Sequence, residues 1–141
     1  MITSLKVHIV SQESSIYAGQ ASMLIASGVQ GDLGITPRHA PLMTTLRPGP
    51  VRILNLEEAE EVIYVSGGIL EVQPFEVTIL ADTVLRGKDL DEAEVERAKK
   101  MAEMVLAGRH GEKEYSLARA ELARAAGILR TIRELKRAMR H

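Results

Sequence analysis

Histidine is the side chain in this sequence with the widest chemical use, as a base, a proton carrier or a metal ligand. The four histidines stand far apart in the chain, at His8, His39, His110 and His141. A metal site needs three or four ligands that converge, and the chain has no cysteine to supplement its few imidazoles. We therefore expect no metal site, no catalytic residues and no disulfide.

Two other groups of residues have types that could support chemistry. The carboxylates of the run EEAEE (57–61) could act as acid and base, but that role needs a buried carboxylate with a shifted pKa. The glycines at 28, 31 and 34 could hold a phosphate, but Thr36-Pro37 follows where a phosphate-binding loop would lead into a helix. We interpret the first group as an exposed hairpin tip and the second as turns.

The elements that position these residues fall into two parts with different hydrophobic periods. Residues 1–87 contain short runs such as LKVHIV and EVIYV, separated by Gly, Pro, Asp and Asn. Alternation of this kind predicts β-strands, and many short strands with close turns favour an antiparallel sandwich or barrel. The predicted fold class is an all-β N-terminal antiparallel sandwich (1–87) plus a C-terminal α-helical hairpin (88–141).

The second part shows the 3.6-residue period of amphipathic helices. Asp89 is the predicted N-cap of a first helix over 90–106. Gly108 and Gly111 then interrupt the pattern, and we expect a second helix to begin near Ser116. Two amphipathic helices joined by a short break predict an antiparallel helical hairpin.

Positive charge is concentrated at the end of the chain. The net charge is −1, but residues 115–141 hold seven basic and two acidic side chains. On a helical wheel four of the basic residues form a stripe beside the apolar face: Arg119, Arg130, Arg133 and Arg137. This arginine stripe is either solvated surface or a binding surface for an acidic partner. An aromatic content of 3% leaves little for base stacking, so we expect no nucleic-acid partner.

Two stretches of the sequence carry a family resemblance. They are GDLGITPRHAPLMTTLRPGPVRI (31–53) and VSGGILEVQPFEVTILADTVLRGKDLDEAEVERA (65–98). Through them the sequence resembles the epsilon subunit of bacterial F-type ATP synthase over nearly the whole chain. The resemblance implies a noncatalytic subunit of the central rotor, which couples proton transport to ATP synthesis. It also implies a peripheral position on the cytoplasmic face of the bacterial inner membrane, and no apolar run approaches the roughly 18 residues that direct membrane insertion would need.

The resemblance also implies the partners of the sandwich, which are the gamma subunit and the loops of the c-ring. Asp32 and His39 map onto c-ring contact positions in a rigid, proline-rich loop. Arg38 stands where the family commonly has glycine, which argues against a left-handed backbone there and adds a cation to the contact. The alternative interpretation is an ordinary hairpin connection.

The family resemblance gives the C-terminal helices a role as an extendable arm that contacts the alpha and beta subunits and inhibits ATP hydrolysis. The arginine stripe would contact an acidic segment of the beta subunit, because planar guanidinium groups suit carboxylates. We expect Gly108 and Gly111 to act as the hinge. Gly127 lowers the stability of the second helix by about 1 kcal/mol relative to alanine, and the alanines facing the sandwich bury little area, so the folded arm is expected to be weakly held.

The alternative function is a nucleotide-sensing module whose hairpin binds ATP. Some family members bind ATP through an Ile/Leu-Asp-x-x-Arg-Ala motif at the start of the first helix. Here LDEAEV (90–95) keeps Asp91 but places Glu94 where the motif has arginine, and a carboxylate repels a phosphate. Arg130 remains as a phosphate contact, so we expect weak or absent ATP binding and no cofactor.

Overall fold

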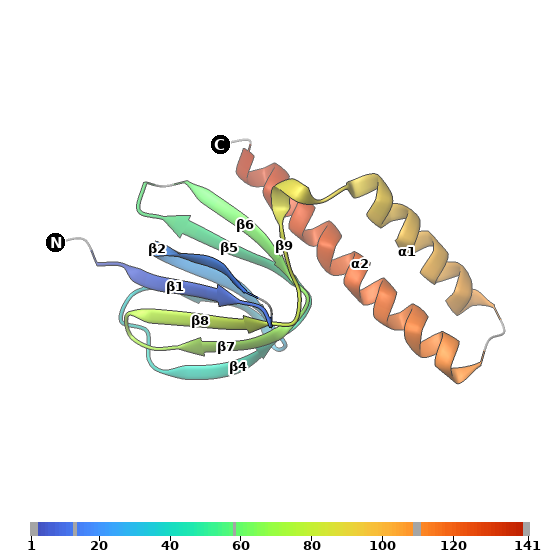
Figure 1. The fold of residues 1–141 in the computed structure, drawn as a ribbon, viewed down its shortest axis with the longest axis horizontal. Helices are drawn as coiled ribbons and strands as arrows, with labels where there is room; N and C mark the ends of the chain where they lie inside the picture. Colours follow the sequence, from blue (N-terminus) through green and yellow to red (C-terminus); the bar gives the residue numbers. More distant parts are fainter. Residues whose placement is uncertain (1–2, 13, 58, 109–110, 140–141) are drawn as a thin grey trace.

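The computed structural model describes residues 3–12, 14–57, 59–108 and 111–139. They form a β-sandwich followed by two antiparallel helices that project from one end (Figure 1). The strands in this part of the chain are β1 (Leu5–Val10), β2 (Ser15–Gly28), β3 (Gly31–Ile35), β4 (Leu42–Leu46), β5 (Gly49–Asn55), β6 (Glu60–Val65), β7 (Gly68–Val72), β8 (Glu76–Ala81) and β9 (Val84–Arg86). The 3-10 turn η1 (Gly87–Asp89) leads to the helices α1 (Glu92–Ala107) and α2 (Glu112–Met139). The predicted fold class, a sandwich plus a helical hairpin, is confirmed.

A continuous set of strand pairings runs around the sandwich. The strand order is β1-β8-β7-β4-β2-β5-β6-β9, and β1 also pairs with β2, which closes the set on itself. The 14 residues of β2 make this closure possible, because they pair with β1 at one end and with β4 at Gly28 at the other, while β5, β6 and β9 continue from β2. Among the described strands β3 pairs with β2 alone, so β3 forms a free edge.

The core of the sandwich comes from the alternating residues that the sequence pattern predicted. Leu5, Val7 and Ile9 of β1 are fully buried, whereas Lys6 and His8 of the same strand are not. The buried side chains pack with Val, Ile and Leu residues of the other strands in one contiguous apolar cluster. Burial of this aliphatic cluster is the main driving force for folding of the sandwich.

The segment expected to be one rigid loop, residues 31–41, contains the strand β3. β3 and β4 enclose a turn at Pro37-Arg38, so residues 31–41 are not a continuous loop. Glycines and threonines break the apolar alternation of these short strands, which is why the pattern did not reveal them. Arg38 has a φ of 71°, so the inference against a left-handed backbone at this residue was wrong.

Both helices begin at residues other than those predicted. Asp91, and not Asp89, caps α1, because its carboxylate accepts hydrogen bonds from two backbone N–H groups of the first turn at 3.0 and 3.3 Å. Asp89 lies in the preceding turn η1. α2 begins at Glu112, so Ser116 lies inside the helix. Acidic residues in its first turn favour this earlier start through their interaction with the helix dipole.

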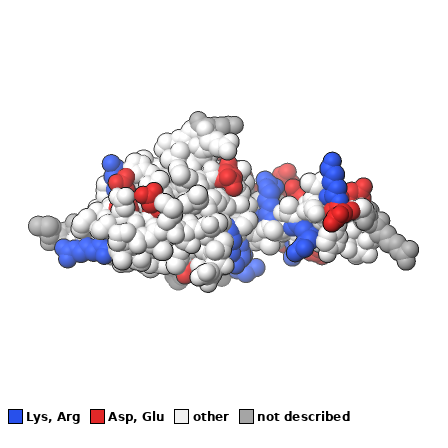
Figure 2. All heavy atoms as spheres, turned by 90° about the horizontal axis from the view of Figure 1, so that it is seen from below, with Lys and Arg blue, Asp and Glu red and all other residues white. Residues whose placement is uncertain are grey.

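α2 lies between α1 and the sandwich (Figure 1). Its C-terminal half packs on β5 and β6, and its N-terminal half projects beyond the sheet together with α1. Charges of both signs gather on the hairpin, while much of the sandwich surface in the same view is uncharged (Figure 2). Within the described residues, neither helix combines the length and the apolar character needed to cross a membrane.

Candidate functional site

The candidate functional site is the interface that holds α2 on the sandwich, which we call the docking interface. Its apolar part joins Tyr64 of β6 to Ile128 and Ile132 of α2, and all three side chains are buried. Burying one isoleucine side chain contributes about 1.5–3 kcal/mol. Ala125, one of the alanines expected on the inward face of the hairpin, is also buried, and the two isoleucines bury more apolar area beside it.

The turn between β4 and β5 forms the second part of the docking interface. Gly127 of α2 lies so close to this turn that a Cβ atom placed on it would stand 2.9 Å from the carbonyl carbon of Pro48. One helical turn further on, Arg130 donates a hydrogen bond to the carbonyl oxygen of Pro48. A Cβ atom at Gly49 would stand 3.0 Å from the same guanidinium group. Glycines on both sides thus let the helix contact the backbone of the turn.

Charged residues surround this corner. Arg47, which precedes Pro48, pairs with Asp32 of β3 at 3.3 Å. Burial lowers the pKa of Arg130, the positive charge of Arg47 lowers it further, and the carboxylate of Asp32 opposes the change. Asp32 therefore compensates part of the positive charge that accumulates where the arm meets the sandwich.

Four charged side chains form the third part of the docking interface. Glu60 of β6 accepts hydrogen bonds from Arg137 of α2, at 2.7 and 2.9 Å, and from Arg52 of β5 at 2.5 Å. Glu134 of α2 accepts a hydrogen bond from Arg137 at 2.7 Å and lies 3.5 Å from Arg52. Burial by itself raises the pKa of Glu60, but the hydrogen bonds from Arg52 and Arg137 outweigh it and hold the pKa below its ordinary value. Glu60 is thus a charged anchor for the end of the arm.

Sequence reasoning missed Glu60, because it assigned the whole acidic run to an exposed tip. The Glu60 side chain is only 14% exposed, and the neighbouring Glu61 pairs with Arg86 at 2.8 Å. The apolar run at 62–65 that follows was the sequence feature that could have indicated the burial of Glu60. A strand with apolar residues on both faces is covered on both sides, and Glu60 shares its outer face with Tyr64.

The structure divides the arginine stripe into two pairs. Arg130 and Arg137 bind the sandwich through Pro48 and Glu60. Arg119 and Arg133 are exposed, and the guanidinium of Arg119 lies 5.9 Å from the ring centre of Tyr115. In the folded arm, two of the four residues predicted for partner contact are therefore engaged within the chain.

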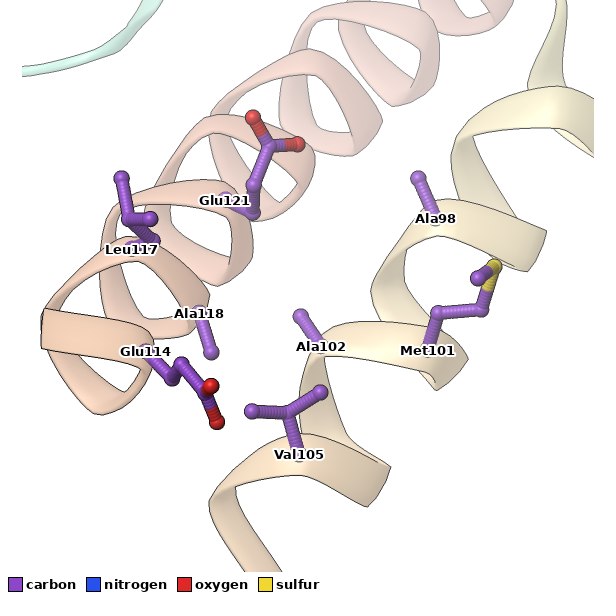
Figure 3. Close-up of a pocket in the computed structure, with 8 residues that line it drawn as sticks. All are labelled: Ala98, Met101, Ala102, Val105, Glu114, Leu117, Ala118 and Glu121. Atoms are coloured by element: carbon purple, nitrogen blue, oxygen red, sulfur yellow. The ribbon is translucent and has the colours of Figure 1, made fainter. Parts of the chain in front are cut away.

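The outer half of the hairpin is held by small residues. Ala102 of α1 and Ala118 of α2 are buried, while Met101 and Leu117 remain exposed. The two helices enclose an apolar groove of about 450 Å³ (Figure 3), lined by Ala98, Met101, Ala102, Val105, Glu114, Leu117, Ala118 and Glu121. This half of the hairpin thus rests on little buried area.

Of the residues between the helices, Gly108 is the C-cap of α1 and Gly111 immediately precedes α2. Residues 109–110 lie outside the described residues, and with them His110. His141 lies outside them as well. Among the residues that the structure does describe, no three His, Cys, Asp or Glu side chains are grouped as a metal ion would require.

The structure does not bring the predicted c-ring residues into one compact patch. Asp32 lies near the start of β3, beside the docking interface. Arg38 and His39 follow the other end of β3, where the backbone N–H of Arg38 donates to the carbonyl of Pro74 at 2.5 Å. The imidazole Nδ1 of His39 lies 2.7 Å from the carbonyl oxygen of Ala40. The three predicted residues are thus distributed along the free edge of the sandwich.

The residues considered for nucleotide binding are also apart. Asp91 lines a cavity of about 220 Å³ at the start of α1, whereas Arg130 is bound at Pro48 and does not line this cavity. Arg124 is the cation of the cavity, and it faces four carboxylates, those of Asp89, Asp91, Glu94 and Glu121. A lining with this excess of negative charge disfavours a bound phosphate.

Both parts of the chain match known protein families. Residues 4–87 match the family described as "ATP synthase, Delta/Epsilon chain, beta-sandwich domain", and residues 88–133 match "ATP synthase, Delta/Epsilon chain, long alpha-helix domain". The chain belongs to the ATP synthase epsilon chain family. It is thus a noncatalytic subunit of F-type ATP synthase, as the sequence predicted.

Individual epsilon chains agree with this assignment. The epsilon chain of Alkalilimnicola ehrlichii is 52% identical over 136 residues, and that of Halorhodospira halophila is 53% identical over 137 residues. Each alignment covers 96% of this chain and 97% of the relative. These relatives therefore align with both the sandwich and the arm.

Two solved assemblies contain chains with the same fold. A chain of the Euglena gracilis mitochondrial ATP synthase, solved as OSCP/F1/c-ring, has a TM-score of 0.84 at 14% identity and covers 92% of this chain and 81% of its own length. A chain of the Tetrahymena thermophila mitochondrial central stalk and c-ring has a TM-score of 0.62 at 15% identity, covering 91% and 96%. At such low identity these likenesses show the fold alone.

Proposed function

We propose that this epsilon chain is part of the rotating central stalk, couples proton transport to ATP synthesis, and inhibits ATP hydrolysis when its arm leaves the sandwich. The observation that carries the proposal is the docking interface. It consists of three small, separate contacts, and the outer half of the hairpin projects beyond them. A free-energy difference of a few kcal/mol between docked and released forms is what a switch requires.

The sandwich (1–87) is the part that binds the rotor in this proposal. The outer face of β4, β7 and β8 carries exposed apolar side chains, among them Met43, Ile69 and Leu80. Ile69 and Leu80 lie directly opposite each other in the strand register. Exposed apolar residues that adjoin one another mark protein interfaces, so we assign this face to the gamma subunit.

The free edge along β3 is the surface for the c-ring loops in the same proposal. Asp32 offers a carboxylate at one end of this edge, and Arg38 and His39 offer cationic or polar groups at the other. Contact with the ring would run along the edge instead of at one loop tip. Pro37 restricts the backbone before Arg38 and Pro41 restricts it after His39, which lowers the entropy lost on binding.

The arm (88–141) contacts the alpha and beta subunits when released. Gly108 and Gly111 act as the hinge, and the arginine stripe meets carboxylates of the beta subunit. α2 has 28 residues, which at 1.5 Å per residue span about 42 Å, enough to reach far from the sandwich. The whole subunit lies peripherally on the cytoplasmic face of the inner membrane.

Truncation tests this proposal. Ending the chain after Gly108 removes α2 and keeps the sandwich, so the variant is expected to assemble and to raise ATP hydrolysis by the complex several-fold. The matched control removes only the residues after Met139, which leaves the docking interface intact and should not change the rate. Unchanged hydrolysis by a complex that has incorporated the shorter chain would contradict the inhibitory role.

A further inference from the structure

Glu60 and Arg137 contact each other across the docking interface. One guanidinium nitrogen of Arg137 reaches both carboxylate oxygens of Glu60, at 2.7 and 2.9 Å. Charge-assisted hydrogen bonds of this length are among the strong ones in proteins. While the arm is docked, the guanidinium group of Arg137 is therefore bound to the Glu60 carboxylate of the sandwich.

The two carboxylates around Arg137 differ in what happens to them when the arm leaves. Glu134 lies three residues before Arg137 on α2, so this pair moves with the arm. Glu60 belongs to β6 and is also held by Arg52 of the neighbouring strand β5, so it stays with the sandwich. Release of the arm thus exchanges one carboxylate partner of Arg137 and keeps the other.

We propose that Glu60 is a built-in competitor for the carboxylates of the partner subunit. The inference rests on the proposed function, since the released arm must present Arg137 to an acidic surface. In the folded chain Glu60 occupies the group that the partner would bind, so this sandwich carboxylate opposes release of the arm in addition to the apolar cluster and the Pro48 contact. Arg133 is exposed in the folded arm, so it does not help to hold the arm on the sandwich. It contacts the partner subunit only after the arm is released.

The competition predicts opposite effects of two charge removals. Glu60→Gln weakens the folded arm without altering any arm residue, so the complex should hydrolyse ATP about three- to tenfold more slowly, the range expected when a charge-assisted hydrogen bond is replaced by a neutral one. Arg133→Ala leaves the folded arm in place and weakens its contact with the partner. Complexes with this variant should hydrolyse ATP faster than the wild type.

Glu61→Gln is the matched control for Glu60→Gln. It makes the same chemical change one residue away, where the carboxylate pairs with Arg86 of the sandwich at 2.8 Å instead of with the arm. The rate of hydrolysis should equal that of the wild type. Circular dichroism and thermal melting check that each variant folds, and Glu60→Asp, which keeps the charge on a shorter side chain, should lie between the wild type and Glu60→Gln.

The position of the arm is measured separately in the isolated full-length chain. The sequence has no cysteine, so spin labels on cysteines introduced at the exposed residues Thr36 and Ala123 report one distance by electron spin resonance. Glu60→Gln should raise the fraction of molecules with a long distance, and Glu61→Gln should not.

The two kinds of failure are distinguishable. If truncation after Gly108 raises hydrolysis while Glu60→Gln alters neither the distance nor the rate, the competition is wrong and the inhibitory arm stands. If Glu60→Gln releases the arm and hydrolysis does not fall, the competition is also wrong. If truncation itself leaves hydrolysis unchanged, the proposed function fails first.

Discussion

Arg38 adopts a φ of 71° in the turn after β3. A left-handed backbone costs a non-glycine residue about 1–2 kcal/mol, because the Cβ atom crowds the following carbonyl group. Pro37 before it fixes the preceding φ, and proline followed by a left-handed residue is the combination that a type II turn uses. The backbone of this turn is therefore restricted at Pro37 and strained at Arg38.

Replacing Arg38 by glycine should relieve this strain. We expect Arg38→Gly to raise the free energy of unfolding by about 1 kcal/mol, measured by urea denaturation of the isolated chain. Arg38→Ala removes the guanidinium but retains the strained backbone, so its stability should match the wild type. Equal stability of the glycine and alanine variants would show that the backbone angle has no energetic consequence.

Protonation of Glu60 makes the docking of the arm depend on pH. Burial raises its pKa, but hydrogen bonds from Arg52 and Arg137 outweigh burial and leave the pKa below its ordinary value. A carboxylate whose pKa is lowered in the docked state stabilises that state above its free pKa of about 4.3, and the stabilisation disappears as pH falls through the lowered value. Docking should therefore be constant between about pH 7 and 5.

Below about pH 4 the spin-label distance should lengthen, because protonated Glu60 no longer attracts Arg137. The other charged groups around Glu60 are Arg52, which stays cationic, and Glu134 of α2. Glu134 also lies 3.5 Å from Arg52 across the interface, so Glu60→Gln should reduce the dependence on pH without removing it. An identical pH profile for the wild type and this variant would contradict the assignment.

At the scale of elements, α2 fits the sandwich because Gly127 has no side chain. Alanine at this position would place its Cβ atom 2.9 Å from the carbonyl carbon of Pro48, and backbone atoms of a proline turn have little freedom to move away. Alanine also raises helix propensity by about 1 kcal/mol relative to glycine. α2 is a helix in both the docked and the released form, so the gain in propensity does not change the balance between them, and the close approach to Pro48 is what favours the released form.

Gly127→Ala should therefore shift the arm toward the released form and lower ATP hydrolysis by the complex severalfold. Ala126→Ser adds one atom at the adjacent exposed position and should leave the rate unchanged. The same two variants in the isolated chain should differ in the spin-label distance. Stronger docking of the alanine variant would show that the helix does not depend on this close approach.

Sequence patterns predicted the elements whose periodicity is regular and failed where a contact depends on distant residues. The apolar stripes of α1 and α2 and the alternation in β1 could be identified from sequence, because each records which face is buried. The capping role of Asp91 was within reach, but Asp89 offered the same local chemistry two residues earlier. A single sequence does not distinguish two equivalent caps so close together.

The docking interface was the part that sequence reasoning could not assemble. Glu60 and Arg137 are 77 residues apart, and Gly127 meets Pro48 across a similar separation. Local propensity explains Gly127 as a weak point of a helix. Its role as a point of close approach exists only once the turn at Pro48 is placed against it.

At the scale of the whole molecule, the chain is a β-sandwich that keeps its own core and an arm held by a separate, smaller apolar cluster. The large cluster lies wholly within the strands, whereas the small one joins Tyr64 to two isoleucines of α2. Loss of the small cluster therefore leaves the sandwich core intact. Release of the arm does not require unfolding of the rest of the molecule.

A reversible lock tests the central claim that the docked arm permits hydrolysis and the released arm inhibits it. The side chains of Arg52 on β5 and Glu134 on α2 meet across the docking interface, with Nε and Oε2 3.5 Å apart. The chain has no cysteine of its own, so Arg52→Cys combined with Glu134→Cys can be joined by a short bifunctional thiol reagent that a reductant cleaves.

The decisive measurement is ATP hydrolysis by the complex that carries this double variant, crosslinked and then reduced, with each single cysteine variant as a control. The crosslink should raise the rate to that of the complex truncated after Gly108, and reduction should lower it severalfold. Equal rates before and after reduction, or slower hydrolysis when the arm is locked on the sandwich, would contradict the account.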